Sequence, residues 1–183
     1  LAALEWKKKK LNVFDTPGFN LFLYDTKISM AAADAALIVV DGVSGVEVMT
    51  ERVWEYAEQY VLPRAFFVNK LDRERSDFQA TVANIIEVFG RHCLPIHLPI
   101  GSERDFTGIV DLISLKAFSY TPDGDGKGTE IPIPDDMADA AKEAHDALIE
   151  MVAEGNDALM EKFFDAGTLP VEDIMSGLHE SVK

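Results

Sequence analysis

The sequence of 183 residues predicts an α/β fold, in which a parallel sheet with helices on both faces is followed by a smaller α+β unit. Three observations predict it. Short apolar runs bounded by Gly, Pro, Asn or Asp are typical of buried strands. Helical periodicity lies between these runs, and the alternation of strand and helix indicates a parallel sheet. The pattern changes near Gly101, so we expect one domain over 1–100 and a second over 101–183.

Four apolar runs define the strands expected in the first domain. They cover Leu11–Phe14, Ala35–Val40, Ala65–Val68 and Ile96–Leu98. Apolar residues at helical spacing predict helices over Val46–Tyr60 and Ser76–Phe89. The basic run Lys7–Lys10 precedes the first strand, and we interpret it as a solvated hairpin turn.

The second domain begins with short strands and ends in helices. Strands of a small antiparallel unit are expected over Gly108–Leu112 and Lys116–Tyr120. The stretch Ile131–Pro134 cannot be a central strand, because proline lacks the N–H donor that the ladder needs. Three helices are expected after it, over Asp135–Glu154, Asp157–Asp165 and Val171–Lys183.

Composition excludes several classes of protein. Seventeen Lys and Arg against 32 Asp and Glu give a net charge of −15, which argues against a surface that binds nucleic acid throughout, though a local nucleotide pocket stays open. The single cysteine, Cys93, excludes an internal disulfide framework and a cysteine zinc site, and the nearby His92 and His97 show no further ligand pattern. No apolar run approaches the ~18 residues of a membrane helix, so we expect no membrane association and a cytoplasmic location.

The tetrapeptide Asp15-Thr16-Pro17-Gly18 directly follows a predicted strand. An Asp at the carboxyl end of a strand can hold Mg²⁺ through water, because Mg²⁺ prefers oxygen ligands and keeps its waters. Gly18 has no Cβ, so its backbone N–H can approach a phosphate oxygen closely. The same four residues also make an ordinary turn, and alone they do not separate the two interpretations.

The tetrapeptide Asn69-Lys70-Leu71-Asp72 follows another predicted strand. An Asp carboxylate can accept two hydrogen bonds from the paired donors of a guanine edge, and adenine offers no such pair. Asn69 can contact the acceptor side of the base or brace the loop, and the Lys70 stem can lie along its face. The alternative is a solvated polar loop. One strand and one helical segment separate the two tetrapeptides, an order that places both along the same sheet edge.

Five segments together carry a resemblance to a known family. They are Asp15–Gly18, Asp41–Glu47, Pro63–Arg73, Leu98–Glu103 and Asp105–Leu112. In these segments the sequence resembles the GTP-binding domain of the translational GTPases, and most closely that of bacterial elongation factor G. The last segment is similar to the start of the insert subdomain of that factor. The resemblance implies a P-loop-GTPase-like sheet, incomplete in this chain, with an α+β insert.

The resemblance also implies a function and a set of site residues. It implies binding of GTP or GDP with Mg²⁺, coupled to movement on the ribosome through contacts with rRNA and stalk proteins. Carried over, Asp15 would sit in the magnesium shell through water and the Gly18 amide would sense the γ-phosphate. Asn69, Lys70 and Asp72 would hold guanine. Thr16, Pro17, Phe19 and Leu71 complete the two GTP-binding segments.

The sequence departs from the family at two points. No Gly-x-x-x-x-Gly-Lys-Ser/Thr phosphate loop occurs in the 183 residues, and the chain begins at Leu1 without Met, so we expect a fragment that alone binds GTP weakly or not at all. Whether this chain is an enzyme is therefore left open. Phe19 stands where the family usually has a His that orients the attacking water, so we expect a parent protein that hydrolyses GTP slowly or positions water differently, as a divergent paralogue would.

Two other classes of function remain open at this point. One is an interaction module with a nucleotide-binding fold and no working site. The other is a related ribosome-associated GTPase, of the release-factor or ribosome-protection type. An incomplete sheet exposes a strand edge, so an edge-paired homodimer is a further expectation.

Overall fold

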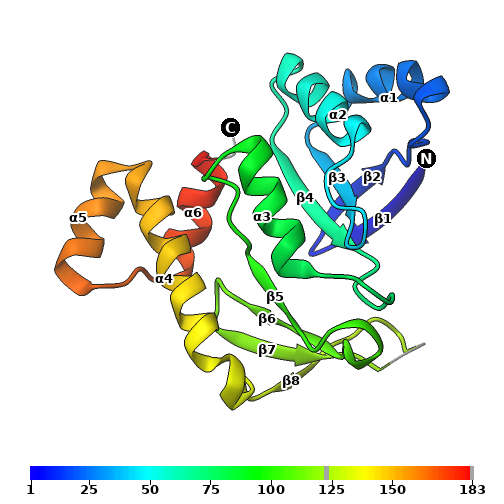
Figure 1. Ribbon diagram of the computed structural model, residues 1–183. Helices are drawn as coiled ribbons and strands as arrows, with labels where there is room; N and C mark the ends of the chain where they lie inside the picture. Colours follow the sequence, from blue (N-terminus) through cyan, green and yellow to red (C-terminus); the bar gives the residue numbers. More distant parts are fainter. Residues whose placement is uncertain (122–123, 182–183) are drawn as a thin grey trace. The chain divides into compact units, whose positions relative to one another are not determined.

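The computed structural model describes residues 1–121 and 124–181 (Figure 1). The last two residues of the helix expected over Val171–Lys183 therefore lie outside the described residues. The chain divides into two compact units, of which unit 1 comprises residues 1–40 and 47–67, and unit 2 comprises residues 41–46 and 68–183. A domain boundary near Gly101 stays a prediction.

Unit 1 contains two pairs of strands and two α-helices. Its elements are β1 (Ala2–Trp6), β2 (Lys9–Val13), the 3₁₀ turn η1 (Asn20–Phe22), α1 (Leu23–Met30), β3 (Ala36–Asp41), α2 (Val48–Gln59) and β4 (Arg64–Asn69), and the last residues of β3 and β4 belong to unit 2. The helix α1 has no counterpart in the sequence prediction. Its buried residue is Thr26, while Tyr24 and Ile28 are exposed, so it lacks the buried apolar stripe on which such a prediction rests.

The first two strands form an antiparallel hairpin. Trp6 lies opposite Lys9, and Lys7 and Lys8 have φ values of 46° and 64°. Positive φ at both central residues is typical of a two-residue hairpin turn, which confirms the hairpin turn predicted for the basic run. The expectation of a buried parallel strand over Leu11–Phe14 is wrong, because β2 pairs antiparallel with β1 and all five of its residues are exposed.

The strands β3 and β4 form the predicted parallel pair. The Ala36 N–H donates to the Pro63 carbonyl at 2.9 Å and the Gly42 N–H donates to the Asn69 carbonyl at 2.8 Å, a constant offset that only parallel strands produce. The connecting helix α2 begins with a capping box between Glu47 and Thr50.

One face of this pair is covered and the other is open. The Trp54 ring of α2 stacks on Phe66 of β4, with ring centroids 4.9 Å apart. On β3, Ile38 and Val40 are buried, whereas Leu37 and Val39 are 65% and 58% exposed. Buried and exposed residues alternate along β3 with the two-residue period of a strand. The face that carries Leu37 and Val39 is therefore exposed in unit 1.

Unit 2 combines an antiparallel sheet with four α-helices in its described part. Its elements are α3 (Phe78–Phe89), β5 (His97–Ile100), η2 (Glu103–Asp105), β6 (Gly108–Asp111), β7 (Lys116–Ser119), β8 (Thr129–Ile131), η3 (Asp135–Met137), α4 (Ala138–Glu154), α5 (Asp157–Ala166) and α6 (Val171–Ser181). The strand order is β5-β6-β7-β8 and each pairing is antiparallel. Each helix and strand predicted beyond Gly101 is present within a few residues of its expected bounds.

The strand β5 belongs to this antiparallel sheet, whereas the sequence predicts it in the parallel sheet of the first domain. The run Ile96–Leu98 predicted a further parallel strand, and this is wrong, because β5 pairs antiparallel with β6. Pro99 within β5 lacks an N–H donor, which suits a strand at the edge of its sheet. The strand β8 lies at the opposite edge and ends at Ile131, which confirms that Ile131–Pro134 is no central strand.

The core of unit 2 is formed by residues of its sheet and of α4, α5 and α6. Leu112, Leu148, Ile149 and Ile174 are at most 1% exposed. The buried His145 of α4 forms a hydrogen bond of 2.6 Å through its Nδ1 atom with the Leu112 carbonyl, which ties the helix to the sheet. Within the described part of the chain, no helix is long and apolar enough to cross a membrane.

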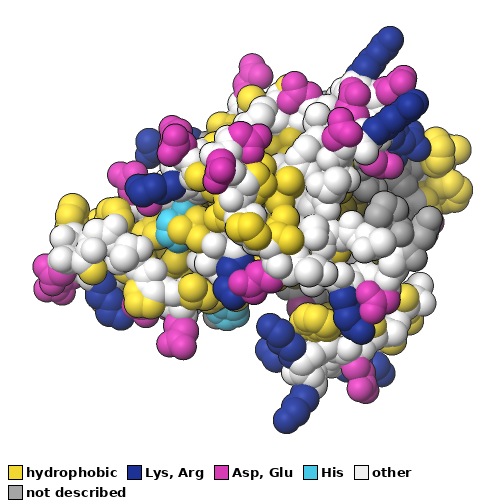
Figure 2. All heavy atoms as spheres, turned by 90° about the horizontal axis from the view of Figure 1, so that it is seen from below, with side chains coloured by type: hydrophobic (Ala, Val, Ile, Leu, Met, Phe, Trp, Pro, Cys, Tyr) yellow, Lys and Arg dark blue, Asp and Glu magenta, His cyan; other side chains and the backbone are white. Residues whose placement is uncertain are grey.

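Figure 2 shows that carboxylates and basic groups are spread over the face in view rather than gathered into one patch of either sign. On that face the negative net charge of the chain is therefore not concentrated at a single binding site.

Candidate functional site

The loop Asn69–Asp72 begins at the carboxyl end of β4 and turns sharply. Lys70 has a φ of 62°, in the left-handed region that residues other than Gly seldom adopt. The Asn69 Oδ1 atom accepts the Lys70 N–H at 2.9 Å, and the Lys70 carbonyl accepts the Arg73 N–H at 3.2 Å. Asn69 therefore braces the loop, one of the two roles that the sequence allowed for it.

A carboxylate on the neighbouring strand holds the same loop. The Lys70 ammonium donates to Asp41 Oδ2, and Asp41 Oδ1 accepts the Val43 N–H at 2.9 Å and the Ser44 N–H at 3.4 Å. The hydrogen bond from Lys70 holds the pKa of the Asp41 carboxyl below its ordinary value, and the Val43 N–H adds to this effect against the opposing effect of burial. Asp41 is thus ionised at neutral pH, and its charge fixes the Lys70 side chain.

Backbone contacts lock the two strand ends together. Gly42 donates its N–H to the Asn69 carbonyl at 2.8 Å and accepts the Asp77 N–H at 3.0 Å. A Cβ at Gly42 would lie 3.0 Å from Leu71 Cδ2 and 3.1 Å from the Asn69 carbonyl oxygen. A Cβ here would therefore require Leu71 or the Asn69 backbone to shift by a few tenths of an ångström. On the far side of the loop, the Ser76 hydroxyl donates to the Leu71 carbonyl at 2.8 Å.

The side chains of this loop differ in how far solvent reaches them. Asn69 and Asp72 are exposed, and Lys70 and Leu71 are half-buried. Within residues 1–121 and 124–181, no hydrogen bond or ion pair engages the Asp72 carboxylate. A fixed loop that presents a free carboxylate can accept two parallel N–H donors from a planar ring, a geometry that selects one base over another.

The turn Asp15–Gly18 lies in unit 1, directly after β2, and is much more open. Asp15, Pro17 and Gly18 are exposed and Thr16 is half-buried. A Cβ at Gly18 would meet no atom within 4 Å. An exposed Asp15 carboxylate suits Mg²⁺, which binds through one or two carboxylates and retains several waters. In the described residues, no group of three or more His, Cys, Asp or Glu side chains is placed to hold a metal ion.

Phe19 follows this turn and is the N-cap residue of η1. Its carbonyl accepts the Phe22 N–H at 2.9 Å, and its side chain is 76% exposed. The ring can neither donate nor accept the hydrogen bond that positions a water molecule. The residues Asp15–Phe19 and Asn69–Asp72 belong to different units, and each set is contiguous in the chain.

Sequence reasoning missed Asp41 as a member of the site. The signal was present, because an Asp-Gly pair closes the apolar run of β3 just as Asn-Lys closes that of β4. Neighbouring parallel strands end at the same sheet edge, so polar residues that close both runs are expected to meet.

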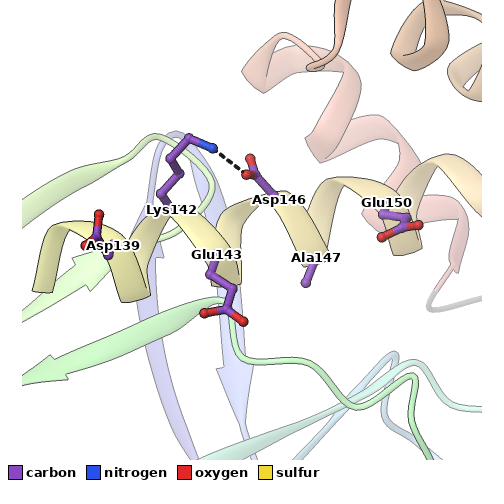
Figure 3. A pocket seen from close by; sticks show the side chains of 6 residues that line it. All are labelled: Asp139, Lys142, Glu143, Asp146, Ala147 and Glu150. Atoms are coloured by element: carbon purple, nitrogen blue, oxygen red, sulfur yellow. Dashed lines mark hydrogen bonds and ion pairs between the residues drawn. The ribbon is translucent and has the colours of Figure 1, made fainter.

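A shallow pocket on α4 is separate from these residues. Its lining consists of Asp139, Lys142, Glu143, Asp146, Ala147 and Glu150 (Figure 3). Lys142 and Asp146 form an ion pair of 2.7 Å one helical turn apart, and this hydrogen bond raises the pKa of Lys142. All six residues lie on the exposed face of α4, which agrees with the solvated acidic face expected from the sequence.

Comparison with known proteins adds two findings. The family model described as "Elongation factor Tu GTP binding domain" matches residues 1–174. A crystal structure of a protein from Thermus thermophilus is similar, with a TM-score of 0.88 and 30% sequence identity over 99% of this chain. The match covers 27% of that protein, so the chain spans about a quarter of the length of its relative.

Proposed function

This chain belongs to the family of elongation factor Tu GTP-binding domains, and we propose that within it the chain is part of a GTPase of the elongation factor G type. The parent protein would bind GTP or GDP with Mg²⁺ and drive translocation on the ribosome in the cytoplasm, in contact with rRNA and stalk proteins. The strands β6 to β8 and the helices α4 to α6, which follow Gly101, support this type, because elongation factor G carries its insert at this point of its GTP-binding domain.

The proposal gives each site residue a role. Asp72 accepts the two N–H donors of the guanine edge, the Asn69 side-chain amide donates to the acceptor side, and the Lys70 stem lies along the ring. In the other segment, Asp15 binds a water molecule of the Mg²⁺ shell and the Gly18 N–H donates to the γ-phosphate. Mg²⁺, when bound, neutralises charge on the transferring phosphate.

One observation carries this proposal more than any other. The Asn69–Asp72 loop is held in a left-handed turn by contacts from three sides, while its terminal carboxylate has no partner among the described residues. A solvated polar loop would not need such bracing. A loop that is ordered before the ligand arrives loses less conformational freedom on binding.

A nucleotide titration of this chain tests the proposal. We expect fluorescent GDP with Mg²⁺ to bind in the millimolar range, about −4 kcal/mol, because contacts to the base act without a phosphate loop in these residues. ADP should bind more weakly. Asp72→Asn should abolish the preference for GDP and favour xanthosine diphosphate, because xanthine carries an oxygen acceptor where guanine carries an amino donor.

The outcomes separate the alternatives. Equal affinity for GDP and ADP would contradict guanine recognition, and no binding of either would favour the nucleotide-free interaction module. A release-factor or ribosome-protection type of GTPase would bind GDP as well, so a translocation assay with the parent protein distinguishes those types. Phe19 stands where the family usually has the His that orients water, so we expect the parent protein to hydrolyse GTP slowly. A normal ribosome-stimulated rate of GTP hydrolysis would contradict this expectation.

An edge-paired homodimer remains part of the proposal for this chain. The parallel pair β3–β4 and the hairpin β1–β2 are separate two-stranded sheets, and each leaves strand edges available for pairing. Light scattering at high protein concentration tests this, and a monomeric mass would count against the dimer.

A further inference from the structure

We infer that Asp41 is a positioning residue for guanine recognition, because it holds the Lys70 ammonium and thereby fixes the stem that lies along the base. This inference rests on the proposed function of the Asn69–Asp72 loop. Asp41 itself would not touch the nucleotide in this arrangement. It would act through Lys70, from the end of the neighbouring strand.

The two oxygens of the Asp41 carboxylate have different partners. Oδ1 accepts the N–H groups of Val43 and Ser44 in the turn that follows β3, which fixes the orientation of the carboxylate. Oδ2 is then aimed at the Lys70 ammonium. The pair is partly shielded from water, since the Lys70 side chain is 39% exposed and that of Asp41 is 23% exposed. Partial shielding strengthens such a pair relative to one on the open surface.

Lys70 is consequently held at both ends of its side chain. At the backbone, the left-handed turn and the hydrogen bond to Asn69 fix the Cα position. At the other end, Asp41 fixes Nζ. A free lysine stem has many rotamers, and ordering it on binding would weaken affinity. Because both ends of the Lys70 side chain are held, its rotamer is fixed before a base stacks on the stem.

The insert supplies a matched control for Asp41. Asp111 also ends a strand, β6, and its Oδ1 atom accepts the Ile113 N–H at 2.9 Å, the same distance as from Val43 to Asp41. Its second oxygen accepts the Ser114 hydroxyl at 2.6 Å rather than a lysine. Asp111→Asn therefore removes an equivalent charge from an equivalent turn without changing Lys70.

The experiment records the side-chain ammonium signals of lysine by ¹⁵N NMR in the full chain. The Lys70 signal should be visible in the wild type, because an ion pair slows proton exchange, and it should be lost in Asp41→Asn and kept in Asp111→Asn. Asparagine preserves the acceptor for Val43 but places an amide N–H₂ group toward Lys70. A Lys70 signal that persists in Asp41→Asn would overturn the inference.

Nucleotide affinity provides the second readout. Asp41→Asn should weaken GDP binding about fivefold relative to Asp111→Asn, and Lys70→Met should weaken it similarly. The double variant of Asp41→Asn and Lys70→Met should bind GDP no more weakly than either single variant, because the two substitutions remove the same interaction. Additive losses, or an equal loss in Asp111→Asn, would overturn the inference. If the wild type binds no GDP, the proposed function fails for this chain, and the ammonium signals still decide whether Asp41 holds Lys70.

Discussion

The two segments that the sequence marks as functional differ in how they are held. Both are polar turns that follow an apolar strand, and neither is distinguished from the other by composition. The Asn69–Asp72 loop is braced by Asp41, Gly42 and Ser76, all within unit 2. The Asp15–Gly18 turn in unit 1 is exposed, and a Cβ at Gly18 would meet only open space. The Asn69–Asp72 loop is thus ordered by contacts within the chain. Under the proposed function it would be ordered before a base arrives, whereas the Asp15–Gly18 turn would gain contacts from the metal and phosphate.

The same contrast holds for the packing of the two units. Leu148 in unit 2 is fully buried, whereas Leu37 in unit 1 is 65% exposed. We expect Leu148→Ala to lower the free energy of unfolding by about 2–5 kcal/mol, because it leaves a cavity in a closed core. Leu37→Ala should change it by less than ~0.5 kcal/mol. Urea denaturation measures the free energy of unfolding of both variants. Equal losses would contradict the difference in packing between the two units.

A glycine in each segment tests the comparison directly. A Cβ at Gly42 would come within 3.0 Å of Leu71 Cδ2 and 3.1 Å of the Asn69 carbonyl oxygen. Gly42→Ala should therefore destabilise unit 2 by about 1–3 kcal/mol through overpacking. Gly18→Ala should change the free energy of unfolding by less than ~0.5 kcal/mol, because its surroundings are open. Thermal unfolding of the two variants side by side is the measurement, and a larger loss in Gly18→Ala would contradict this account of the turn.

The smallest expected effect concerns pH. The pKa of Asp41 is lowered in the folded chain, so its contribution to stability is present above the ordinary carboxyl pKa and is lost as the pH falls through the folded value. Asp41→Asn should therefore be less stable than the wild type at pH 7, by about 1 kcal/mol or less. The difference should shrink as the pH falls below the ordinary carboxyl pKa. A difference independent of pH would show that the charge of Asp41 does not act on stability.

Much of this architecture follows from local sequence patterns. The apolar residues of α2 and α3 recur at helical spacing, and this spacing predicts both helices within a few residues of their bounds. The hairpin turn at Lys7–Lys10 was predicted from its charge. The Asn69–Asp72 segment was predicted as a site because residue types with matching chemistry follow a strand. These features depend on neighbours in the chain.

The features that local patterns do not determine depend on partners distant in the chain. Asp41 and Lys70 are 29 residues apart, and their contact exists only because β3 and β4 end side by side. The apolar run of β5 looks the same whether its neighbour is parallel or antiparallel, so its pairing with β6 could not be predicted locally. The helix α1 buries Thr26 rather than an apolar stripe, which removes the pattern that marks a surface helix.

The measurement that tests the central claim most directly is an NMR titration of the ¹⁵N-labelled chain with GDP and, separately, with ADP. The account predicts that millimolar GDP shifts the backbone amide signals of Asn69–Asp72, that ADP leaves them in place, and that Asp72→Asn abolishes the GDP response. Equal shifts with both nucleotides, or shifts with GDP that spare Asn69–Asp72, would contradict the claim that this loop recognises guanine.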